Sequence, residues 1–409
     1  MGNKKNAWLK FDNTKKEEIF SFCEGYKKYI SDCKTERESI KEAIYLAESK
    51  GYRDLKNVIS AGKSLKAGDK VYYNNMDKSL ALFLIGSESI ESGMRIIGSH
   101  VDSPRLDLKP NPLYEDSELS LMETHYYGGV KKYQWVTIPL ALHGVVVKKD
   151  GTKIDVVVGE EETDPVVMVS DLLVHLASEQ QQKKATEVIA GEDLNILVGS
   201  MPLEGEEKEA VKANILKLLK EKYDFEEEDF MSAEIEIVPA GKARDLGLDR
   251  SMVAGYGHDD RICAYTSLLA LLETESTKKT SVVLLVDKEE VGSIGATGMQ
   301  SRFFENAVAE LMDRVGEYSE LKLRRALANS KMLSSDVTAA FDPNYAGAYE
   351  KKNSAFFGKG LAFAKYTGAR GKSGCNDANA EFVAWLRNVM DENDVAYQMA
   401  ELGKVDQGG

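Results

Sequence analysis

Four short segments of the sequence carry carboxylates or a histidine beside predicted strand ends. They are residues 98–104 (GSHVDSP), 257–261 (GHDDR), 287–293 (DKEEVGS) and 334–337 (SSDV). Open α/β sheets bind ligands in the loops that follow the carboxyl ends of their strands. We therefore expect these four segments to contribute to one site.

The residue types in these segments suit a centre with two metal ions. Imidazole and carboxylate ligands suit zinc, manganese or cobalt. Two such ions lie about 3.5–4 Å apart and need a carboxylate between them to offset their repulsion. A further carboxylate must then accept a proton from the attacking water. The adjacent Glu289 and Glu290 can divide the roles of base and ligand, and His100 and Asp102 those of ligand and orienting partner.

Each segment taken alone also has an ordinary structural interpretation. A histidine after a strand is more often a structural or surface residue. Asp259 and Asp260 suit a helix N-terminus, where acidic side chains interact favourably with the helix dipole. An adjacent glutamate pair is common on surfaces. The occurrence of all four segments in one predicted α/β domain favours the site.

The elements that must position these residues alternate between strands and helices. Residues 68–86, 94–99 and 281–286 have strand patterns, and the second of these ends at a Gly-Ser-His turn. Apolar spacing predicts helices over 15–50, 261–272, 303–315 and 378–392. This alternation predicts an α/β sheet with helices on both faces.

The middle of the chain has a different, strand-rich character. It begins with several prolines, continues with predicted strands at 145–147, 154–158 and 233–238, and contains a charged helix at 204–222. We predict an inserted β-rich domain at 105–240, within a larger catalytic domain formed by residues 1–104 and 241–409.

Composition excludes several classes of partner. The 409 residues carry a net charge of −14, which argues against nucleic acid or an anionic membrane as a partner. No apolar run reaches the roughly 20 residues that span a bilayer, and the polar N-terminus predicts a cytoplasmic protein. Cys23, Cys33, Cys263 and Cys375 form no C-x-x-C pair, so a thiolate zinc site is disfavoured.

The order of these motifs resembles the aspartyl aminopeptidase family of two-metal zinc aminopeptidases. The family runs G-S-H-x-D-S-P and D-x-E-E-V-G-S match residues 98–104 and 287–293, and its S-x-D run with a following P-N-Y matches 334–336 and 343–345. Residues 127–130 (YGGV) resemble its Y-G-G-G segment. The resemblance implies an α/β fold: a mixed-sheet, zinc-exopeptidase-like catalytic domain with an inserted β-rich dimerisation domain.

The resemblance also implies roles for individual residues. Two divalent ions, zinc first and manganese or cobalt as alternatives, would be bound by His100, Asp259, Glu290 and Asp336. Asp259 would bridge the ions, and Glu290 would bind the ion that lacks His100 or share it. Glu289 would act as general base and Asp102 would orient His100. The implied reaction is removal of N-terminal residues from peptides through a metal-bridging hydroxide, with a preference for acidic residues as a further expectation.

Substrate and assembly contacts are implied as well. His175 matches a family histidine that reaches the active site of a neighbouring subunit, although a histidine of an amphipathic helix is an equal alternative. Lys372 is a further candidate for substrate binding. The expected assembly is a homo-oligomer of dimers, in the family commonly a dodecamer.

The sequence departs from the family pattern at several positions. Ala339 stands where a histidine is usual, residues 135–141 replace a W-F-D-R segment, and His258 replaces an apolar residue before Asp259. The first two departures bear on the preference for acidic residues rather than on hydrolysis. The sequence as given ends at Gly409, before the position of the family's final metal-binding histidine. We therefore expect this chain to have little activity by itself, unless another histidine such as His258 serves as ligand.

Two other functions compete with the aminopeptidase. A non-catalytic assembly subunit of the same fold would follow from the loss of part of the metal site, but Glu289 and Asp259 argue against it. A two-metal phosphoesterase lacks support, because the sequence has no Gly-rich phosphate loop and no arginine cluster.

Overall fold

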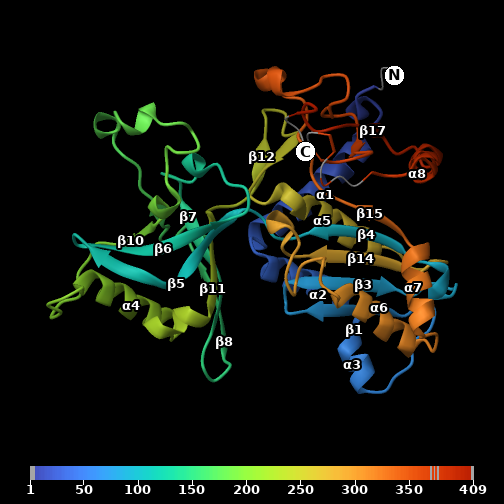
Figure 1. Ribbon diagram of the computed structural model, residues 1–409, viewed down its shortest axis with the longest axis horizontal. Coiled ribbons are helices and arrows are strands. Elements are labelled where there is room, and N and C mark those ends of the chain that lie inside the picture. The colour runs from blue at the N-terminus through green and yellow to red at the C-terminus, as the bar shows by residue number, and fades with distance from the viewer. Residues whose placement is uncertain (1–4, 369–370, 373, 375–376, 407–409) are drawn as a thin grey trace. The chain divides into compact units, whose positions relative to one another are not determined.

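The computed structural model describes residues 5–368, 371–372, 374 and 377–406 (Figure 1). The chain divides into two compact units, one formed by residues 26–336 and the other by residues 1–25 together with 337–409. All residues proposed above as metal ligands lie in the first unit. The α/β fold with a mixed sheet that the sequence predicts is confirmed.

A six-stranded mixed sheet forms the centre of the first unit. Its strands, in spatial order, are β1 (Arg53–Asp54), β2 (Lys70–Asn75), β3 (Ser79–Leu84), β14 (Ser281–Val286), β4 (Arg95–His100) and β15 (Lys331–Ser334). The strands β14, β4 and β15 are mutually parallel neighbours, whereas β3 runs antiparallel to β14. The carboxyl ends of three adjacent strands therefore meet at one edge of the sheet.

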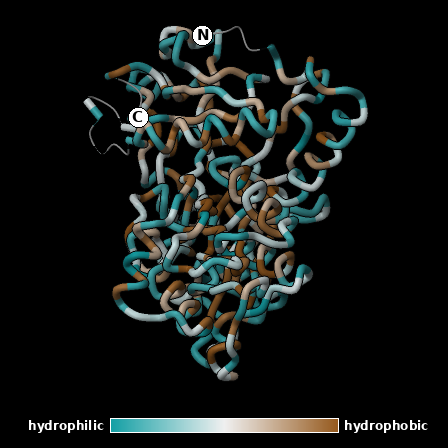
Figure 2. The backbone as a smooth tube through the Cα atoms, turned by 90° about the vertical axis from the view of Figure 1, so that its right-hand side faces the viewer, coloured by the Kyte–Doolittle hydropathy of each residue, from teal (hydrophilic) through white to brown (hydrophobic). Residues whose placement is uncertain are grey.

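Alternating side chains of this sheet supply two separate cores. In β14, Val282 and Leu284 point to one face, while Val283 and Leu285 point to the other, and all four are buried. Burial on both faces explains why residues 281–286 form a continuous apolar run. Figure 2 shows such hydrophobic stretches, in brown, gathered in the middle of the backbone trace.

Helices cover both faces of this sheet (Figure 1). The core on one face contains residues of α3 (Leu55–Ser60), α6 (Phe303–Arg314) and α7 (Glu320–Asn329). The core on the other face contains residues of α2 (Glu36–Ser49) and α5 (His258–Leu272). Burying one Leu, Ile, Val or Phe side chain contributes roughly 1.5–3 kcal/mol. This three-layer packing therefore holds the edge of the sheet in a fixed position.

A second, seven-stranded sheet is built from the middle of the chain. Its strands, in spatial order, are β8 (Lys153–Val158), β7 (Leu140–Val147), β11 (Ala233–Pro239), β5 (Arg105–Asp116), β6 (Leu119–Tyr127), β10 (Ile196–Gly199) and β9 (Met168–Val169). The helix α4 (Ala210–Tyr223) packs against its core. The charged helix expected from residue 204 begins only at Ala210, because Glu209 has the left-handed φ of 47° that an α-helix cannot contain.

The remaining elements are short or belong to the second unit. The pair β12 (Arg244–Leu246) and β13 (Met252–Ala254) leads into α5. The second unit contains β16 (Leu361–Phe363) and β17 (Tyr397–Met399), which pair in parallel, and α8 (Ala380–Glu392). The helix α1 (Asn13–Asp32) begins in the second unit and ends in the first.

The extent of the inserted domain stays a prediction. The strands of the seven-stranded sheet all fall within the expected range 105–240. The division into compact units follows a different boundary and groups both sheets in residues 26–336. Among the described residues, no helix is long and apolar enough to cross a membrane.

A buried ionic cluster links α2 to the seven-stranded sheet. His143 of β7 contacts Glu38 Oε1 through Nδ1 at 2.8 Å and Glu160 Oε1 through Nε2 at 2.9 Å. The ammonium of Lys34 donates to the same Glu160 oxygen at 2.6 Å and to the carbonyl oxygen of Pro239 at 2.8 Å. Burial alone lowers the pKa of His143, but the hydrogen bonds to Glu160 and Glu38 outweigh it, so the pKa of His143 is raised.

This cluster predicts a pH-dependent contribution to stability. Below the ordinary histidine pKa of about 6.5, His143 is protonated in both the folded and the unfolded chain, and its ion pairs contribute in full. As the pH rises through the raised pKa of the folded state, that contribution is lost. His143→Gln should therefore reduce the free energy of unfolding more at pH 6 than at pH 9, as measured by urea denaturation. His125→Gln, at an exposed position of β6, is the matched control, and an equal loss at both pH values would contradict the prediction.

Candidate metal centre

Three chain segments of the candidate site meet at the edge formed by β14, β4 and β15. His100 is the last residue of β4 and lies opposite Val286, the last residue of β14. It belongs to the strand, and not to a turn as the sequence suggested. Glu289 and Glu290 follow in the 3-10 turn η8 (Glu289–Val291), and Asp336 stands two residues beyond the end of β15. The strand order thus brings together residues that are far apart in the sequence.

The fourth segment comes from the start of α5. Asp259 and Asp260 are the second and third residues of this helix, and neither has helical φ and ψ angles. The Ser103 hydroxyl donates to the Asp259 carbonyl oxygen at 2.6 Å, which ties α5 to the segment after β4. Asp259 follows β13, a strand outside the six-stranded sheet, so strand order alone does not place it.

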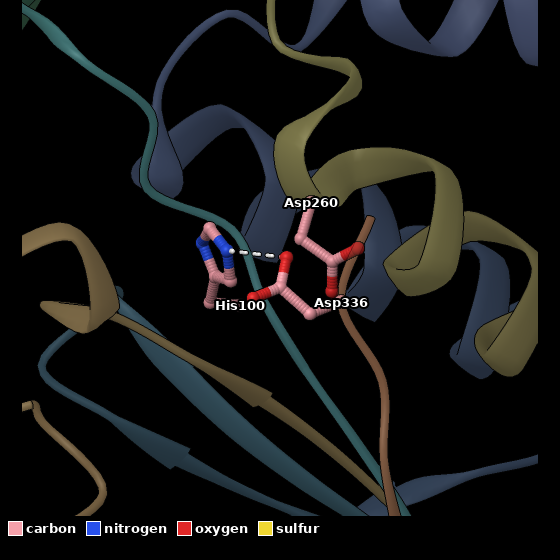
Figure 3. Close-up of side chains that lie close together, drawn as sticks. All are labelled: His100, Asp260 and Asp336. Atoms are coloured by element: carbon pink, nitrogen blue, oxygen red, sulfur yellow. Dashed lines mark ion pairs between the residues drawn. The ribbon is translucent and has the colours of Figure 1, made fainter. Parts of the chain in front are cut away.

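The side chains of these segments converge on one imidazole nitrogen. His100 Nε2 lies 3.0 Å from Asp259 Oδ1, 3.7 Å from Asp336 Oδ1 and 3.8 Å from Glu289 Oε2. Ligand atoms within 4.8 Å of one another form two groups, one of His100, Asp259 and Glu290 and one of His100, Asp260 and Asp336. Figure 3 shows the second group, with Asp260 reaching from α5 and the ion pair between His100 and Asp336 dashed.

Asp260 is the member of these groups that the sequence did not single out. Its carboxylate is buried, and within the described part of the chain neither oxygen has a hydrogen-bond partner. Burial raises the pKa of Asp260 to about 7. Its place beside Asp259 was the available signal, but adjacent acids at a helix start are common, and only the fold shows which of them is buried.

Asp102 organises the site without belonging to either group of ligand atoms. Its side chain is buried, and His100 Nδ1 donates to its backbone oxygen at 3.0 Å and lies 3.4 Å from its Oδ1. Its two carboxylate oxygens accept the backbone N–H groups of Glu289 and Glu290, each at 3.2 Å. Asp102 therefore fixes both the imidazole and the turn that carries the two glutamates.

The concentration of negative charge shifts the pKa values of the site. Burial lowers the pKa of His100, but hydrogen bonds to Asp102, Asp259 and Asp336 outweigh it and raise that pKa strongly. Burial and then Asp259 raise the pKa of Glu290 to about 7. Burial is also the main cause that raises the pKa of Glu289, with Asp336 and Asp102 adding to it.

These properties fit divalent cations. One imidazole and several crowded carboxylates provide nitrogen and oxygen ligands of the kind that zinc, manganese and cobalt accept. The carboxylate oxygens of Asp260 lack a hydrogen-bond partner among the described residues, and its raised pKa shows that burial disfavours a negative charge there unless it is compensated. A bound cation would provide that compensation.

Comparison with known proteins decides the family. A family model described as aminopeptidase I zinc metalloprotease (M18) matches residues 29–409. The chain belongs to this family. The probable M18 family aminopeptidase 1 of Clostridium acetobutylicum is 64% identical over 406 residues, which cover 99% of this chain and 87% of that protein.

Solved structures of M18 proteins share the fold. The crystal structure of the M18 aminopeptidase of Thermotoga maritima matches with a TM-score of 0.95 and 45% identity, over 100% of this chain and 89% of that chain. The yeast mApe1 dodecamer matches with a TM-score of 0.74 and 20% identity, over 94% of this chain and 86% of that chain. At that lower identity, the likeness concerns the fold alone.

M18 membership confirms the prediction of a metal-dependent aminopeptidase from the sequence. The alternative, a non-catalytic assembly subunit, is not favoured, since relatives up to 64% identical are named aminopeptidases. Zinc is the metal that the family description names.

Both ring nitrogens of His258 are engaged away from the site. Tyr26 Oη donates to Nδ1 at 2.7 Å, and Nε2 donates to the Val253 carbonyl oxygen at 3.1 Å. Burial lowers the pKa of His258. This arrangement fixes a neutral imidazole and disfavours His258 as a metal ligand.

The two predicted substrate-binding residues lie outside these ligand groups. His175 is exposed and belongs to a three-residue 3-10 turn, η4 (Val174–Leu176), and not to an amphipathic helix. Lys372 belongs to the second unit. Its Nζ atom lies 3.5 Å from Asp377 Oδ2 and 3.7 Å from the centroid of the Tyr366 ring. Cys375 lies outside the described residues.

Proposed function

We propose that this chain uses two divalent metal ions to remove N-terminal residues from peptides. Zinc is the metal we favour, and the proposed ligands are His100, Asp259, Glu290 and Asp336. The observation that carries the proposal is the convergence of an imidazole and several carboxylates at the carboxyl ends of β14, β4 and β15. Membership of a zinc metalloprotease family supports it.

The contacts of His100 favour one division of the ligands. Because Nδ1 is hydrogen-bonded to the backbone oxygen of Asp102, only Nε2 is available, and one nitrogen binds one ion. We assign His100, Asp259 and Asp336 to the first ion, and Asp259 and Glu290 to the second. Asp259, with two carboxylate oxygens, would bridge the ions, and Asp260 is a further candidate ligand. When bound, such ions polarise a carbonyl group and lower the pKa of water.

Glu289 is the proposed general base. Its backbone is fixed by Asp102, while 46% of its side chain is exposed, so the carboxylate can reach a substrate. Its raised pKa brings it closer to neutral pH, where proton transfer in both directions is efficient. In this role, it accepts a proton from the attacking water and passes it to the leaving amine.

Half-exposed acids at the site suit a substrate with a free amino group. The side chains of Asp259 and Asp336 are 50% and 52% exposed. This exposure would leave ions bound by these carboxylates open to the amino group and first carbonyl of a peptide N-terminus. A preference for acidic residues, and contacts of His175 and Lys372 with substrate, stay predictions, as does the cytoplasmic location.

We infer further that the chain forms a homo-oligomer. Around η4, the side chains of Leu172, Leu173, Val174 and Leu176 are 52%, 63%, 61% and 70% exposed. Contiguous exposed apolar residues mark interaction surfaces. The dodecameric state of the yeast relative and the predicted dimerisation role of residues 105–240 support this inference.

A metal and substrate experiment tests the function. Protein purified without chelator should contain divalent metal by elemental analysis and should cleave peptides with a free N-terminus but not their N-acetylated counterparts. Chelation should abolish turnover, and added zinc should restore it. Equal cleavage of acetylated peptides, or full turnover after verified metal removal, would overturn the proposal.

A further inference from the structure

A tyrosine of the seven-stranded sheet reaches the candidate metal centre of the other sheet. Tyr127 is the last residue of β6, and its hydroxyl donates to Asp102 Oδ2 at 2.7 Å. Both side chains are buried. The family resemblance pointed to the run that begins at Tyr127, but the proposed reaction assigns it no role.

The acceptor of this hydrogen bond is the carboxylate that holds the site together. Asp102 Oδ2 also accepts the backbone N–H of Glu290, and Oδ1 accepts that of Glu289 and lies 3.4 Å from His100 Nδ1. A carboxylate offers about four acceptor positions, so these contacts fix its plane. A rotation of this plane would displace the imidazole and the glutamate turn together.

The ring of Tyr127 is itself held in place. The Arg105 guanidinium lies 3.9 Å from the ring centroid, and the Lys288 ammonium lies 5.2 Å from it. Arg105 is buried and is fixed by Asp107 at 2.8 Å and Glu236 at 3.2 Å. These cation–π contacts and ion pairs give the hydroxyl a defined position.

The backbone after Tyr127 also lies against the site. Gly128 has a φ of 72°, which favours glycine, and a Cβ atom there would lie 3.2 Å from Glu290 Cβ. The backbone at the end of β6 therefore lies against the glutamate turn, while the Tyr127 side chain reaches that turn only through Asp102.

We propose that Tyr127 is a positioning residue, which holds the Asp102 carboxylate and through it aligns His100 with the Glu289–Glu290 turn. The inference rests on the roles proposed for His100 and Glu289. It makes the seven-stranded sheet a structural part of the metal centre. Partners that orient metal ligands typically change metal affinity or activity by about 10–100-fold when removed.

Tyr127→Phe tests this role, because it removes the hydroxyl and keeps the ring over which Arg105 lies. We expect kcat to fall by about 10–100-fold with little change in KM. The visible absorption spectrum of the cobalt-substituted protein should also shift, since it reports the ligand arrangement. Tyr126→Phe, at the exposed neighbouring position on β6, is the control and should leave both unchanged.

A double-mutant cycle separates positioning from a general loss of structure. If Tyr127 acts through Asp102, Tyr127→Phe should add little to the defect of Asp102→Asn. Additive losses, or a lower Tm with an unchanged cobalt spectrum, overturn the proposal. Should Tyr127→Phe not fold, the cobalt spectrum of Asp102→Asn decides, because the amide keeps only one acceptor oxygen, so the bonds from Tyr127, Glu289 and Glu290 cannot all persist, and an unchanged spectrum overturns the proposal. Absence of peptidase activity in the unaltered chain, which is the outcome expected from the sequence if no further histidine serves as ligand, would instead refute the proposed function for this chain and leave the spectra interpretable.

Discussion

Glu289→Gln is expected to lower kcat by about 10²–10⁴-fold while metal content stays unchanged. The amide has nearly the shape of the carboxylate but cannot accept a proton from the attacking water. Glu289 is not a proposed ligand, and its backbone N–H, which Asp102 accepts, is unaffected by the substitution. Steady-state kinetics with a free-amino peptide, together with elemental analysis, measure the two quantities.

The control for this experiment is the same substitution at a glutamate to which we assign no role in the reaction. Glu221 on α4 is 60% exposed and lies 3.8 Å from Lys217. Glu221→Gln should therefore retain full turnover. Unchanged turnover in Glu289→Gln would exclude this residue as the base, and loss of metal from that variant would show that Glu289 is a ligand.

Asp259→Asn is expected to weaken metal binding as well as turnover, since it removes the proposed bridge between two cations. A neutral amide cannot offset the repulsion of two divalent ions a few ångströms apart. Metal affinity should fall by at least the roughly 10–100-fold seen when outer partners of ligands are removed, and turnover should fall with it. Titration of the metal-free chain with zinc against a chromophoric chelator measures the affinity.

Asp249→Asn provides the matched comparison. Asp249 is exposed between β12 and β13, where its carboxylate accepts hydrogen bonds from Ser251. This variant should bind zinc as the unaltered chain does. Retention of two tightly bound ions by Asp259→Asn would show that another carboxylate bridges them, and Asp260 would be the first to test.

Much of the fold follows from local patterns. The buried strand predicted at 281–286 has the bounds of β14, and the helix predicted at 261–272 ends where α5 ends. Continuous apolar runs and helical spacing reflect which faces of a strand or helix are buried. A short window of the sequence is therefore enough to detect them. The predicted first residue of the helix expected at 204–222 was wrong, since α4 begins at Ala210. A charged, acidic segment does not reveal at which residue the helical backbone conformation begins.

The sequence by itself determined the residue types of the candidate centre and their positions at or just after strand ends, namely His100, Asp102, Glu289, Glu290 and Asp336. Short spacings such as those of His100 with Asp102 and Glu289 with Glu290 carry chemical meaning without a fold. Their roles as ligands and base stay predictions until they are measured.

Only the tertiary structure decided which of these residues lie together. The neighbouring positions of β14, β4 and β15 depend on strand pairing between distant segments, which no local periodicity encodes. Burial of Asp260 and engagement of both nitrogens of His258 likewise depend on what packs against α5. The bond from Tyr127 to Asp102 joins two sheets, so its existence depends on long-range packing, whereas the acids it helps to position are visible in the sequence.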